Sequence, residues 1–523
     1  MGPVPFTPTV NAPEGLVCSA DHLASAAGAA LLRRGGSAVD AAIAANAVLA
    51  VADPHLCGLG GDLFALVHDG DGPPAALNAA GRAGSGADLD RLRAEGHRVM
   101  PFRGDIRAVT VPGCVDGWCA LHERYGRLPL ADVLEAAIGY AEDGWPASVL
   151  LAFMAPSVAQ VPGVDEWARR PVADGQRLRR PRTAAALRAV VAGGRDGFYG
   201  GPFGAGLLTL GRGEFTPEDL ERRPDWVEPL GLRAWGHDLW TMPPSSQGYL
   251  ILAGAGVLDP LELPDPEDPA WPHLLAEVCR LVGLDRHDVL SDGAPGEELL
   301  APDRLRAARD RLDAARRVTA PRGPRPAGDT TVVAAVDRHR QGVTLIQSNA
   351  KDFGAHLVEP TTGTFLHNRG NGFRLEPGHP AAYGPGRRPP HTLSPALVTS
   401  PSGALRAVVG TMGGDSQPQV VLQLLARLLV AGEAPGAAMS APRCVLDREG
   451  STGFDLWDGP DRLLVEDHAA PSWVEGLGSR GHDVVVRNGF GAEFGHAQII
   501  DVTREGLRGA ADPRALIGSA VGH

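Results

Sequence analysis

Residues 318–349 read VTAPRGPRPAGDTTVVAAVDRHRQGVTLIQSN, and the middle of this segment carries the clearest structural signal in the sequence. Residues 318–329 hold three prolines and two glycines, so they cannot form a regular helix or strand. Residues 330–336, TTVVAAV, are β-branched and apolar, which predicts a strand buried on both faces. DRHRQG then turns the chain, and residues 343–349 are predicted to return as a second strand. A Pro/Gly-rich linker therefore runs directly into a buried hairpin.

The threonine at this junction suggests a specific chemistry. A threonine hydroxyl is a weak nucleophile without a base, and a threonine that begins a chain can use its own α-amine as that base. The pKa of an α-amine, about 8, leaves a useful neutral fraction near pH 7. Cleavage between Asp329 and Thr330 would create such a chain start. The alternative is an ordinary loop-to-strand junction, which the same pattern fits.

Capping residues and periodicity predict further elements on both sides of the hairpin. Most are helices, and residues 260–317 are expected to be mostly helical. The individual predictions are a helix capped by Ser19 and stopped at Gly35-Gly36, a helix opened by a Ser37–Asp40 capping box, a buried strand LFALV (63–67), and an amphipathic helix over 130–144.

Composition excludes several classes of protein. The chain has 523 residues, 44% hydrophobic, and a formal net charge of −13, which disfavours a nucleic-acid-binding surface. Lys351 is the only lysine, and it lies outside any Walker motif, so neither a P-loop nor a pyridoxal Schiff base is expected. H-E-x-x-H, G-x-S-x-G and G-x-G-x-x-G motifs are also missing. Metal, nucleotide and pyridoxal sites of these kinds are therefore not expected, and acyl transfer by a threonine that uses its own α-amine as base implies no metal or organic cofactor.

Cysteine usage and the first residues point to a cytoplasmic protein. The N-terminal residues 1–15 lack the basic and apolar regions of a secretory signal. The most apolar early stretch, residues 38–51, is shorter than the roughly 20 residues that span a membrane, so no membrane association is expected. No cysteine pair has C-x-x-C spacing, which predicts reduced, buried thiols. The six are Cys18, Cys57, Cys114, Cys119, Cys279 and Cys444.

A series of short motifs runs along nearly the whole chain. They are PHLCGLGGDLFAL (54–66), AVTVPGCVDGW (108–118), YGRLPLADVLEAAIGYAEDGWPAS (125–148), MPPSSQG (242–248), GDTTVVAAVD (328–337), LIQSN (345–349), GTFLHNRGNGF (363–373), RPPHTLSPAL (388–397), GTMGGDSQPQ (410–419), APR (441–443) and GAEFGHAQII (491–500). Single motifs are weak, but their shared order and spacing are specific. In this order the chain resembles the γ-glutamyltransferase family of N-terminal-nucleophile hydrolases.

The resemblance implies an α/β fold, a four-layer αββα sandwich, made as an inactive precursor. Thr330 would attack the carbonyl of Asp329 and be freed by hydrolysis. The products would be a large chain, 1–329, and a small chain, 330–523, which stay together as a heterodimer.

The resemblance also implies roles for individual residues. Thr330 would be the catalytic nucleophile, and the backbone N–H groups of Gly413 and Gly414 would form the oxyanion hole. Asn349 would orient the nucleophile or the substrate. The alternatives are an ordinary tight turn at the glycines and an Asx-turn at Asn349. Thr331 and Asp337 are expected to serve the strand and its turn.

The chain departs from the family pattern where members bind the γ-glutamyl group. Ala80 replaces the carboxylate-binding arginine, and Arg82 follows two residues later. In HNRGNGF (367–373), Arg369 and Asn371 occupy the region of the acidic residue that holds the substrate amine. The remaining changes are His391-Thr392 for a serine pair, and Gln347, next to Ser348, for a hydroxyl that supports the nucleophile.

These departures change the charge that a substrate would meet. An ammonium group loses its acidic partner and meets a cation, so glutathione-type recognition is not expected. Arg82, Arg369, His391 and Arg388 could instead form a carboxylate pocket, together with Thr392, Gln347 and Asn371. For each arginine the alternative is a structural ion pair. The pattern is closer to the oxamate amidohydrolase and cephalosporin acylase-like branch.

The predicted function is an autoprocessing threonine amidohydrolase that cleaves the amide of a small carboxylate-bearing acyl group, with water as acceptor. Its expected partners are a small-molecule amide and the two chains of its own precursor. Three alternatives remain: a true γ-glutamyl transferase, an enzyme that cleaves an acyl–carbon bond, and a non-catalytic family member retained as a binding partner.

Overall fold

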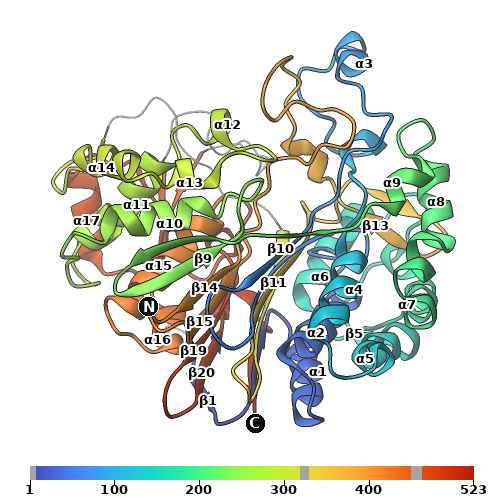
Figure 1. The fold of residues 1–523 in the computed structure, drawn as a ribbon, viewed down its shortest axis with the longest axis horizontal. Coiled ribbons are helices and arrows are strands. Elements are labelled where there is room, and N and C mark those ends of the chain that lie inside the picture. Colours follow the sequence, from blue (N-terminus) through green and yellow to red (C-terminus); the bar gives the residue numbers. More distant parts are fainter. Residues whose placement is uncertain (1–6, 319–328, 449–461) are drawn as a thin grey trace.

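A computed structural model describes residues 7–318, 329–448 and 462–523 of the chain (Figure 1). Two seven-stranded sheets face each other, and all pairings within them are antiparallel. In order across it, the first sheet has β1 (Val10–Ala12), β20 (Leu507–Ala511), β19 (Ala497–Val502), β15 (Leu405–Thr411), β14 (Ala396–Thr399), β9 (His237–Thr241) and β8 (Leu230–Ala234). The second has β21 (Ser519–Gly522), β2 (Leu16–Ser19), β10 (Asp329–Val336), β11 (Gly342–Ala350), β3 (Asp62–His68), β4 (Ala75–Ala79) and β7 (Asp225–Val227).

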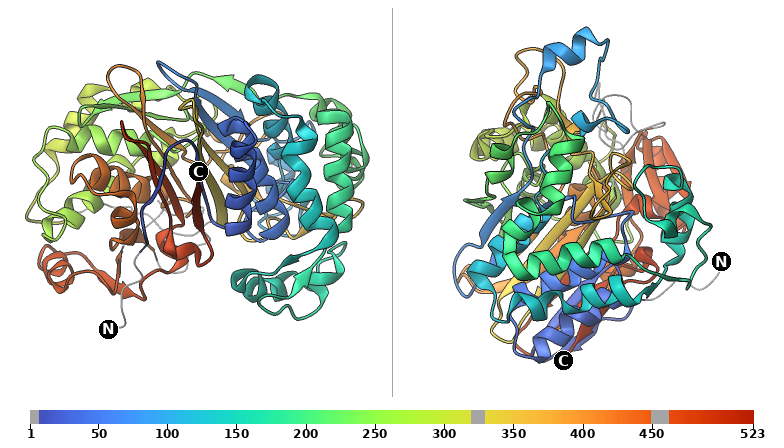
Figure 2. Two further views of the ribbon diagram at one scale, coloured as in Figure 1. Left: turned by 90° about the horizontal axis from the view of Figure 1, so that it is seen from below. Right: turned by 90° about the vertical axis from the view of Figure 1, so that its right-hand side faces the viewer.

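Helices cover the outer face of each sheet (Figures 1 and 2). Over the second sheet lie α1 (His22–Arg33), α2 (Ala38–Ala52), α4 (Cys114–Tyr125), α5 (Leu130–Asp143), α7 (Pro181–Tyr199) and α8 (Pro202–Leu210). Over the first lie α10 (Tyr249–Leu258), α11 (Ala270–Val282), α14 (Pro302–Asp310), α15 (Gln417–Leu429), α16 (Pro435–Ser440) and α17 (Pro471–Ser479). The fold is the predicted αββα sandwich.

Shorter elements complete the described chain. The short helices are α3 (Leu89–Ala94), α6 (Val149–Met154), α9 (Pro217–Glu221), α12 (Arg286–Val289) and α13 (Gly296–Leu299). The small sheets pair β5 (Trp145–Pro146) with β6 (Arg177–Leu178), β12 (Leu357–Glu359) with β13 (Thr364–Leu366), and β16 (Cys444–Asp447) with β17 (Arg462–Glu466) and β18 (Val484–Arg487).

The alternation of side chains along β10 divides the core into layers. Val332, Ala334 and Val336 pack between the two sheets, whereas Val333 and Ala335 pack under the helices. Successive side chains of a strand point to opposite faces, so both faces of β10 are apolar and buried, as predicted.

The two predicted chains interleave within each sheet. β10 and β11 lie between β2 and β3. Apart from Asp329, β10 and β11 belong to residues 330–523, whereas β2 and β3 belong to residues 1–329. In the other sheet, β1 borders β20 and β9 borders β14. Neither segment therefore forms either sheet alone, and the division into two chains stays a prediction.

Most of the predicted elements are confirmed. The Ser37–Asp40 capping box opens α2, and α5 ends before Gly144, whose φ is +106°. The helix that runs up to Gly35-Gly36 is confirmed as α1, but its predicted cap was wrong: Ser19 ends β2, and α1 is capped by Asp21, whose carboxylate accepts from the N–H of Leu23. Asp21 is closer to the first helical turn, where a side-chain acceptor can reach a free N–H. The linker prediction falls mainly on residues 319–328, outside the described residues.

Candidate active site

Thr330 lies at the start of β10 and faces the space between the two sheets. It shares this orientation with Val332 and Ala334 because side chains two residues apart point the same way. The side chain is buried, and its hydroxyl donates to Ser348 Oγ at 3.0 Å. The nucleophile predicted from the sequence therefore meets a hydroxyl of the neighbouring strand.

Gln347 and Ser348 point to opposite faces of β11, which decides their roles. Ser348 shares the face of Thr344 and Ile346 and meets Thr330. Gln347 points the other way: its Oε1 accepts from Gly58 N–H at 3.1 Å, and its Nε2 donates to Gly58 O at 2.7 Å. The hydroxyl that contacts Thr330 therefore belongs to Ser348, one residue after Gln347, the position that the family pattern predicted for it. A substrate role for Gln347 stays a prediction.

Arg369 brings a buried positive charge to the same place. Its Nη2 donates to Ser348 Oγ at 3.4 Å, and its Nη1 donates to Thr392 Oγ1 at 3.0 Å. Burial lowers its pKa to about 10, a shift that the nearby Asp62 carboxylate opposes. The guanidinium remains charged at neutral pH, two hydrogen bonds away from the Thr330 hydroxyl.

Asp62 is the acidic centre of this cluster and was not among the site residues predicted from the sequence. Its Oδ2 lies 3.1 Å from His391 Nε2, 3.7 Å from His367 Nδ1 and 3.9 Å from Arg369 Nε. Burial alone would raise its pKa, but the two imidazoles and the guanidinium outweigh burial and hold the pKa below its usual value. A lone carboxylate opening the apolar strand DLFALV was the available signal, because a buried charge needs partners.

His391 is fully buried and acts as a neutral donor. Burial, helped by the charge of Arg369, lowers its pKa to about 3. Its Nδ1 accepts from Leu393 N–H, which leaves Nε2 to donate to Asp62. His391 therefore supports Asp62, and through it Arg369. Direct contact between His391 and a substrate stays a prediction.

Gly413 and Gly414 lie at the same end of the sandwich as Thr330. β15 crosses β10 so that Leu405 packs near Gly342, Thr344 Oγ1 bonds Val409 O, and a Cβ on Gly410 would lie 2.6 Å from Val332. From Leu405 to Gly410, β15 therefore runs toward the residues that begin β10. The turn that follows Thr411 lies at the end of the sandwich where Thr330 begins the buried strand. Their φ values, +127° and +54°, are ones that glycine adopts without strain.

Asn349 is held beside a backbone turn that precedes β3. Its N–H donates to Leu56 O, and its Nδ2 donates to Pro54 O at 3.1 Å. A Cβ on Gly58 would lie 3.4 Å from the amide. Within the described part of the chain, the buried Oδ1 accepts no hydrogen bond. Asn349 thus has one acceptor still available next to the first residues of β10.

Thr392 and Asn371 line a small cavity of about 40 Å³ beside the glycine turn. Asp415, which follows Gly414, lines it as well, and so does Arg286 of α12. The buried Nδ2 of Asn371 has no hydrogen-bond acceptor among the described residues. The wall therefore presents a donor in the region where the family pattern has an acidic residue.

Arg82 and Arg388 lie elsewhere. Both donate to Asp225 Oδ2, at 3.0 and 2.6 Å, and line a second cavity with Arg222 and Arg223. The sequence offered two roles for each arginine, substrate binding or a structural ion pair, and Arg82 and Arg388 form the ion pair. The two arginines are not among the contacts of Thr330, Ser348 or Arg369 given by the described residues, and a substrate role for Arg82 stays a prediction.

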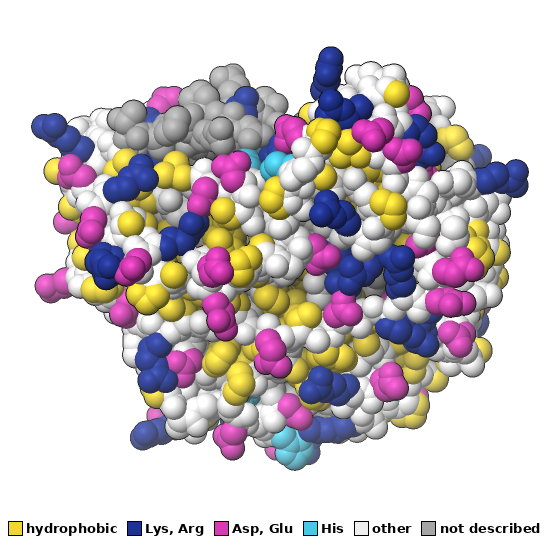
Figure 3. All heavy atoms as spheres, turned by 45° about the horizontal axis from the view of Figure 1, so that its top comes forward, with side chains coloured by type: hydrophobic (Ala, Val, Ile, Leu, Met, Phe, Trp, Pro, Cys, Tyr) yellow, Lys and Arg dark blue, Asp and Glu magenta, His cyan; other side chains and the backbone are white. Residues whose placement is uncertain are grey.

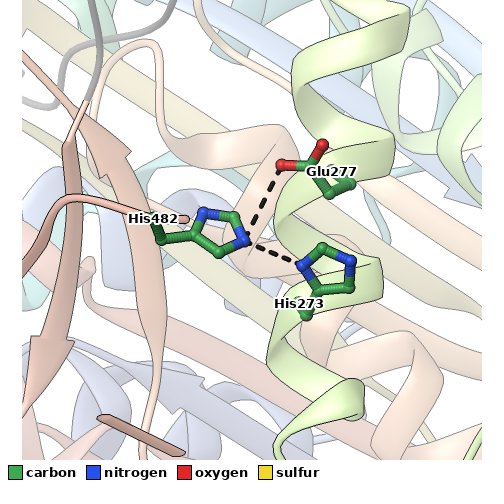
Figure 4. A group of neighbouring side chains, drawn as sticks. All are labelled: His273, Glu277 and His482. Atoms are coloured by element: carbon green, nitrogen blue, oxygen red, sulfur yellow. Dashed lines mark hydrogen bonds and ion pairs between the residues drawn. The ribbon is translucent and has the colours of Figure 1, made fainter. Parts of the chain in front are cut away.

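The only cluster of potential metal ligands within the described ranges is distant from these contacts and has its own partners (Figure 4). His273 Nδ1 lies 2.8 Å from His482 Nε2, and His273 Nε2 lies 2.7 Å from Asp313 O. The Glu277 carboxylate pairs with Arg280 and accepts from Val318 N–H. A guanidinium on the one carboxylate opposes a bound cation, so these residues do not fit a metal.

Two further features are the distribution of charge on the outer surface and the apolar character of the helices. On the face drawn in Figure 3, acidic and basic side chains are interspersed. Among residues 7–318, 329–448 and 462–523, no helix combines the length and the apolar character that membrane crossing requires.

Comparison with known proteins supplies the family. The family model described as gamma-glutamyltranspeptidase matches residues 24–521. The oxamate amidohydrolase proenzyme of Klebsiella pneumoniae is 37% identical, covering 97% of this chain and 98% of that protein. The glutathione hydrolase-like YwrD proenzyme of Bacillus subtilis is 35% identical over 97% and 98%. The cephalosporin acylase structure from Bacillus halodurans superposes with a TM-score of 0.90 at 31% identity, covering 100% and 98%. The chain therefore belongs to the gamma-glutamyltranspeptidase family of N-terminal-nucleophile amidohydrolases and transferases.

Proposed function

We propose that this protein is an autoprocessing threonine amidohydrolase that hydrolyses the amide of a small, carboxylate-bearing acyl group. The main support is the chain of hydrogen bonds from Thr330 through Ser348 to Arg369. It puts a buried cation within two hydrogen bonds of the nucleophile. The relatives named proenzymes support maturation by cleavage.

Maturation starts with attack of Thr330 Oγ1 on the carbonyl carbon of Asp329. The peptide C–N bond breaks, the acyl group moves to oxygen, and the nitrogen becomes a free amine. Water then hydrolyses this ester and leaves a carboxylate on Asp329 and a new chain that begins at Thr330. The interleaved sheets hold residues 1–329 and 330–523 together as a heterodimer after the cut.

Turnover uses the same hydroxyl. The freed α-amine of Thr330 takes the hydroxyl proton while Oγ1 attacks the substrate carbonyl carbon. The N–H groups of Gly413 and Gly414 stabilise the negative oxygen that forms. The leaving amine takes the proton, and water hydrolyses the acyl ester to free the acid. Asn349 Oδ1, an acceptor without a partner among the described residues, orients the α-amine.

The acyl group is short in this proposal. The guanidinium of Arg369 is separated from the nucleophile by one serine hydroxyl, so a carboxylate bonded at or near the scissile carbonyl can reach it. A γ-glutamyl group also carries an ammonium, which would meet Arg369 and the donor amide of Asn371 rather than an acid. The named activity of the Klebsiella relative, an oxamate amidohydrolase, agrees with a short acyl group. The scattered, unpaired cysteines support a cytoplasmic location.

The test combines intact-mass spectrometry with a substrate panel. Wild-type protein should appear as two chains that begin at Met1 and Thr330, whereas Thr330→Ala should stay one chain without amidase activity. Thr331→Ala is the matched control, because this hydroxyl binds Gln347 O on the other face of the strand. Oxamate should be hydrolysed faster than a γ-glutamyl anilide or a cephalosporin side-chain amide. Cleavage in Thr330→Ala, or fast release of glutamate, would contradict the proposal.

A further inference from the structure

The turn that carries Gly413 and Gly414 has each of its carbonyl groups held by a hydrogen bond. Met412 O accepts from Thr411 Oγ1 at 2.8 Å. Gly413 O accepts from Ser416 twice, from the backbone N–H at 3.0 Å and from Oγ at 2.8 Å. Gly414 O accepts from Gln247 Nε2 at 3.0 Å. No peptide plane of this turn is left to rotate freely.

Fixing a carbonyl also fixes the next N–H. The peptide bonds after Met412 and Gly413 are trans, so the carbonyl of one residue and the N–H of the next point in opposite directions in one plane. The bond from Thr411 to Met412 O therefore aims the N–H of Gly413. In the same way, the bonds from Ser416 to Gly413 O aim the N–H of Gly414.

The backbone of Met412 is also held on its other side. The N–H of Met412 donates to His496 O at 3.2 Å. A Cβ on Gly495 would lie 2.7 Å from Thr411 Oγ1 and 2.8 Å from Met412 O, so only a glycine leaves room for this carbonyl and hydroxyl. The Thr411 bond is therefore packed in place and shielded from water.

Gln247 is itself held in place by Arg286, which also pairs with Asp415. Its Oε1 accepts from Arg286 Nε at 3.0 Å, and Arg286 Nη2 donates to Asp415 Oδ1 at 2.8 Å. All three side chains are buried. Gln247 and Arg286 belong to residues 1–329, whereas the glycine turn belongs to residues 330–523. The large segment thus braces the turn of the small one.

We propose that Thr411 and Ser416 are positioning residues that preset the two N–H donors of the oxyanion hole, with Gln247 and Arg286 bracing the turn from the large segment. This inference rests on the proposed function. Donors that are already aimed need no reorganisation when the charge develops, which is the condition for strong transition-state stabilisation. The effect therefore falls on the rate of the chemical step and not on substrate binding.

Thr411 offers a sharp test because valine keeps its shape without its hydroxyl. Thr411→Val should lower kcat about tenfold with KM nearly unchanged, and Thr411→Ser should restore most of the rate. Thr344→Val is the matched control: it also removes a buried hydroxyl bond to a backbone carbonyl, that of Val409, but outside the turn. Rates are taken per two-chain molecule, counted by intact mass.

Equal kcat for Thr411→Val and Thr344→Val would overturn the inference, as would failure of Thr411→Ser to restore the rate. If Thr411→Val blocks maturation, the rate at which the precursor becomes two chains replaces turnover, and the same order of variants is required. Failure of the proposed function looks different. In that case Thr330→Ala would retain activity, whatever the Thr411 variants do.

Discussion

The hydroxyl oxygens of Thr330 and Ser348 lie 3.0 Å apart at the neighbouring ends of β10 and β11. Ser348 also accepts from Ala350 N–H at 2.8 Å and from Arg369 Nη2 at 3.4 Å. One hydroxyl therefore links Thr330, the proposed nucleophile, to the buried Arg369 cation. Its loss should affect both.

Ser348→Ala removes the acceptor that orients the Thr330 hydroxyl. We expect kcat to fall about tenfold, which corresponds to about 1.4 kcal/mol, the size of one ordinary buried hydrogen bond. Ser348→Thr keeps a hydroxyl and should keep most of the rate. Steady-state turnover of the purified protein measures this, and an alanine variant with wild-type kcat would remove Ser348 from the proposed mechanism.

Arg369→Gln should change which substrates are used. Loss of one or two charged hydrogen bonds is expected to reduce kcat/KM for a carboxylate-bearing amide about tenfold to a hundredfold. A neutral analogue of the same length should be affected much less. Arg233→Gln, which alters an exposed pair with Asp238, is the control. If both substrates lost the same factor, Arg369 would have no carboxylate-binding role.

Asp62→Asn should destabilise the fold. The substitution removes the buried carboxylate that faces His391, His367 and Arg369, and breaking such a buried cluster from one side costs about 3–5 kcal/mol in the free energy of unfolding. Asp225→Asn also removes a carboxylate from two arginines, but this one is 46% exposed and should cost far less. Urea unfolding of the four proteins, wild type, each single variant and the double variant, measures the difference. Equal midpoints for the two single variants would contradict this account of Asp62.

Acid should weaken the fold through buried histidines. Burial lowers the pKa of His55 to about 3 and that of His496 to about 4, against 6.5 for an ordinary imidazole. The unfolded chain therefore binds protons below pH 6.5 that the folded chain refuses. The stability these groups contribute is complete above pH 6.5 and is lost as the pH falls toward 4, by about 1.4 kcal/mol per pH unit for each histidine.

A single variant checks this dependence. His496→Gln should make the unfolding free energy depend less steeply on pH between pH 6.5 and pH 4, because it removes one of the buried imidazoles whose pKa is lowered. Denaturant unfolding at several pH values gives the slopes. A wild-type slope in His496→Gln would show that the buried His496 does not contribute to the loss of stability in acid.

Purified protein should contain no stoichiometric metal. The Glu277 carboxylate pairs with Arg280, and the two imidazoles beside it bond each other. Elemental analysis should find well under one zinc per chain, and a chelator should leave activity and thermal unfolding unchanged. One zinc per chain, lost in His482→Gln, would show that the cluster of Figure 4 is a metal site.

Local patterns predicted the central hairpin and several helices correctly. Residues 330–336 and 343–349 form β10 and β11 with one or two residues added, because β-branched runs between turns have few other stable conformations. Asp337 caps the turn between them by accepting from His339 and Gln341 N–H, as expected. The Ser19 cap failed because two polar residues compete near that helix start, and only the folded chain decides between them.

Local pattern and motif order were enough to predict the family, the central hairpin and the position of the threonine at the start of a buried strand. That Ser348, rather than Gln347, meets Thr330, and that Arg369 joins this group while Arg82 pairs with Asp225, follows only from the folded arrangement of the two sheets. This arrangement also placed Asp62, Gln247 and Arg286 around the site. These contacts join residues far apart in the chain, and the facing of two sheets sets them through side-chain alternation and strand register, which no local stretch contains.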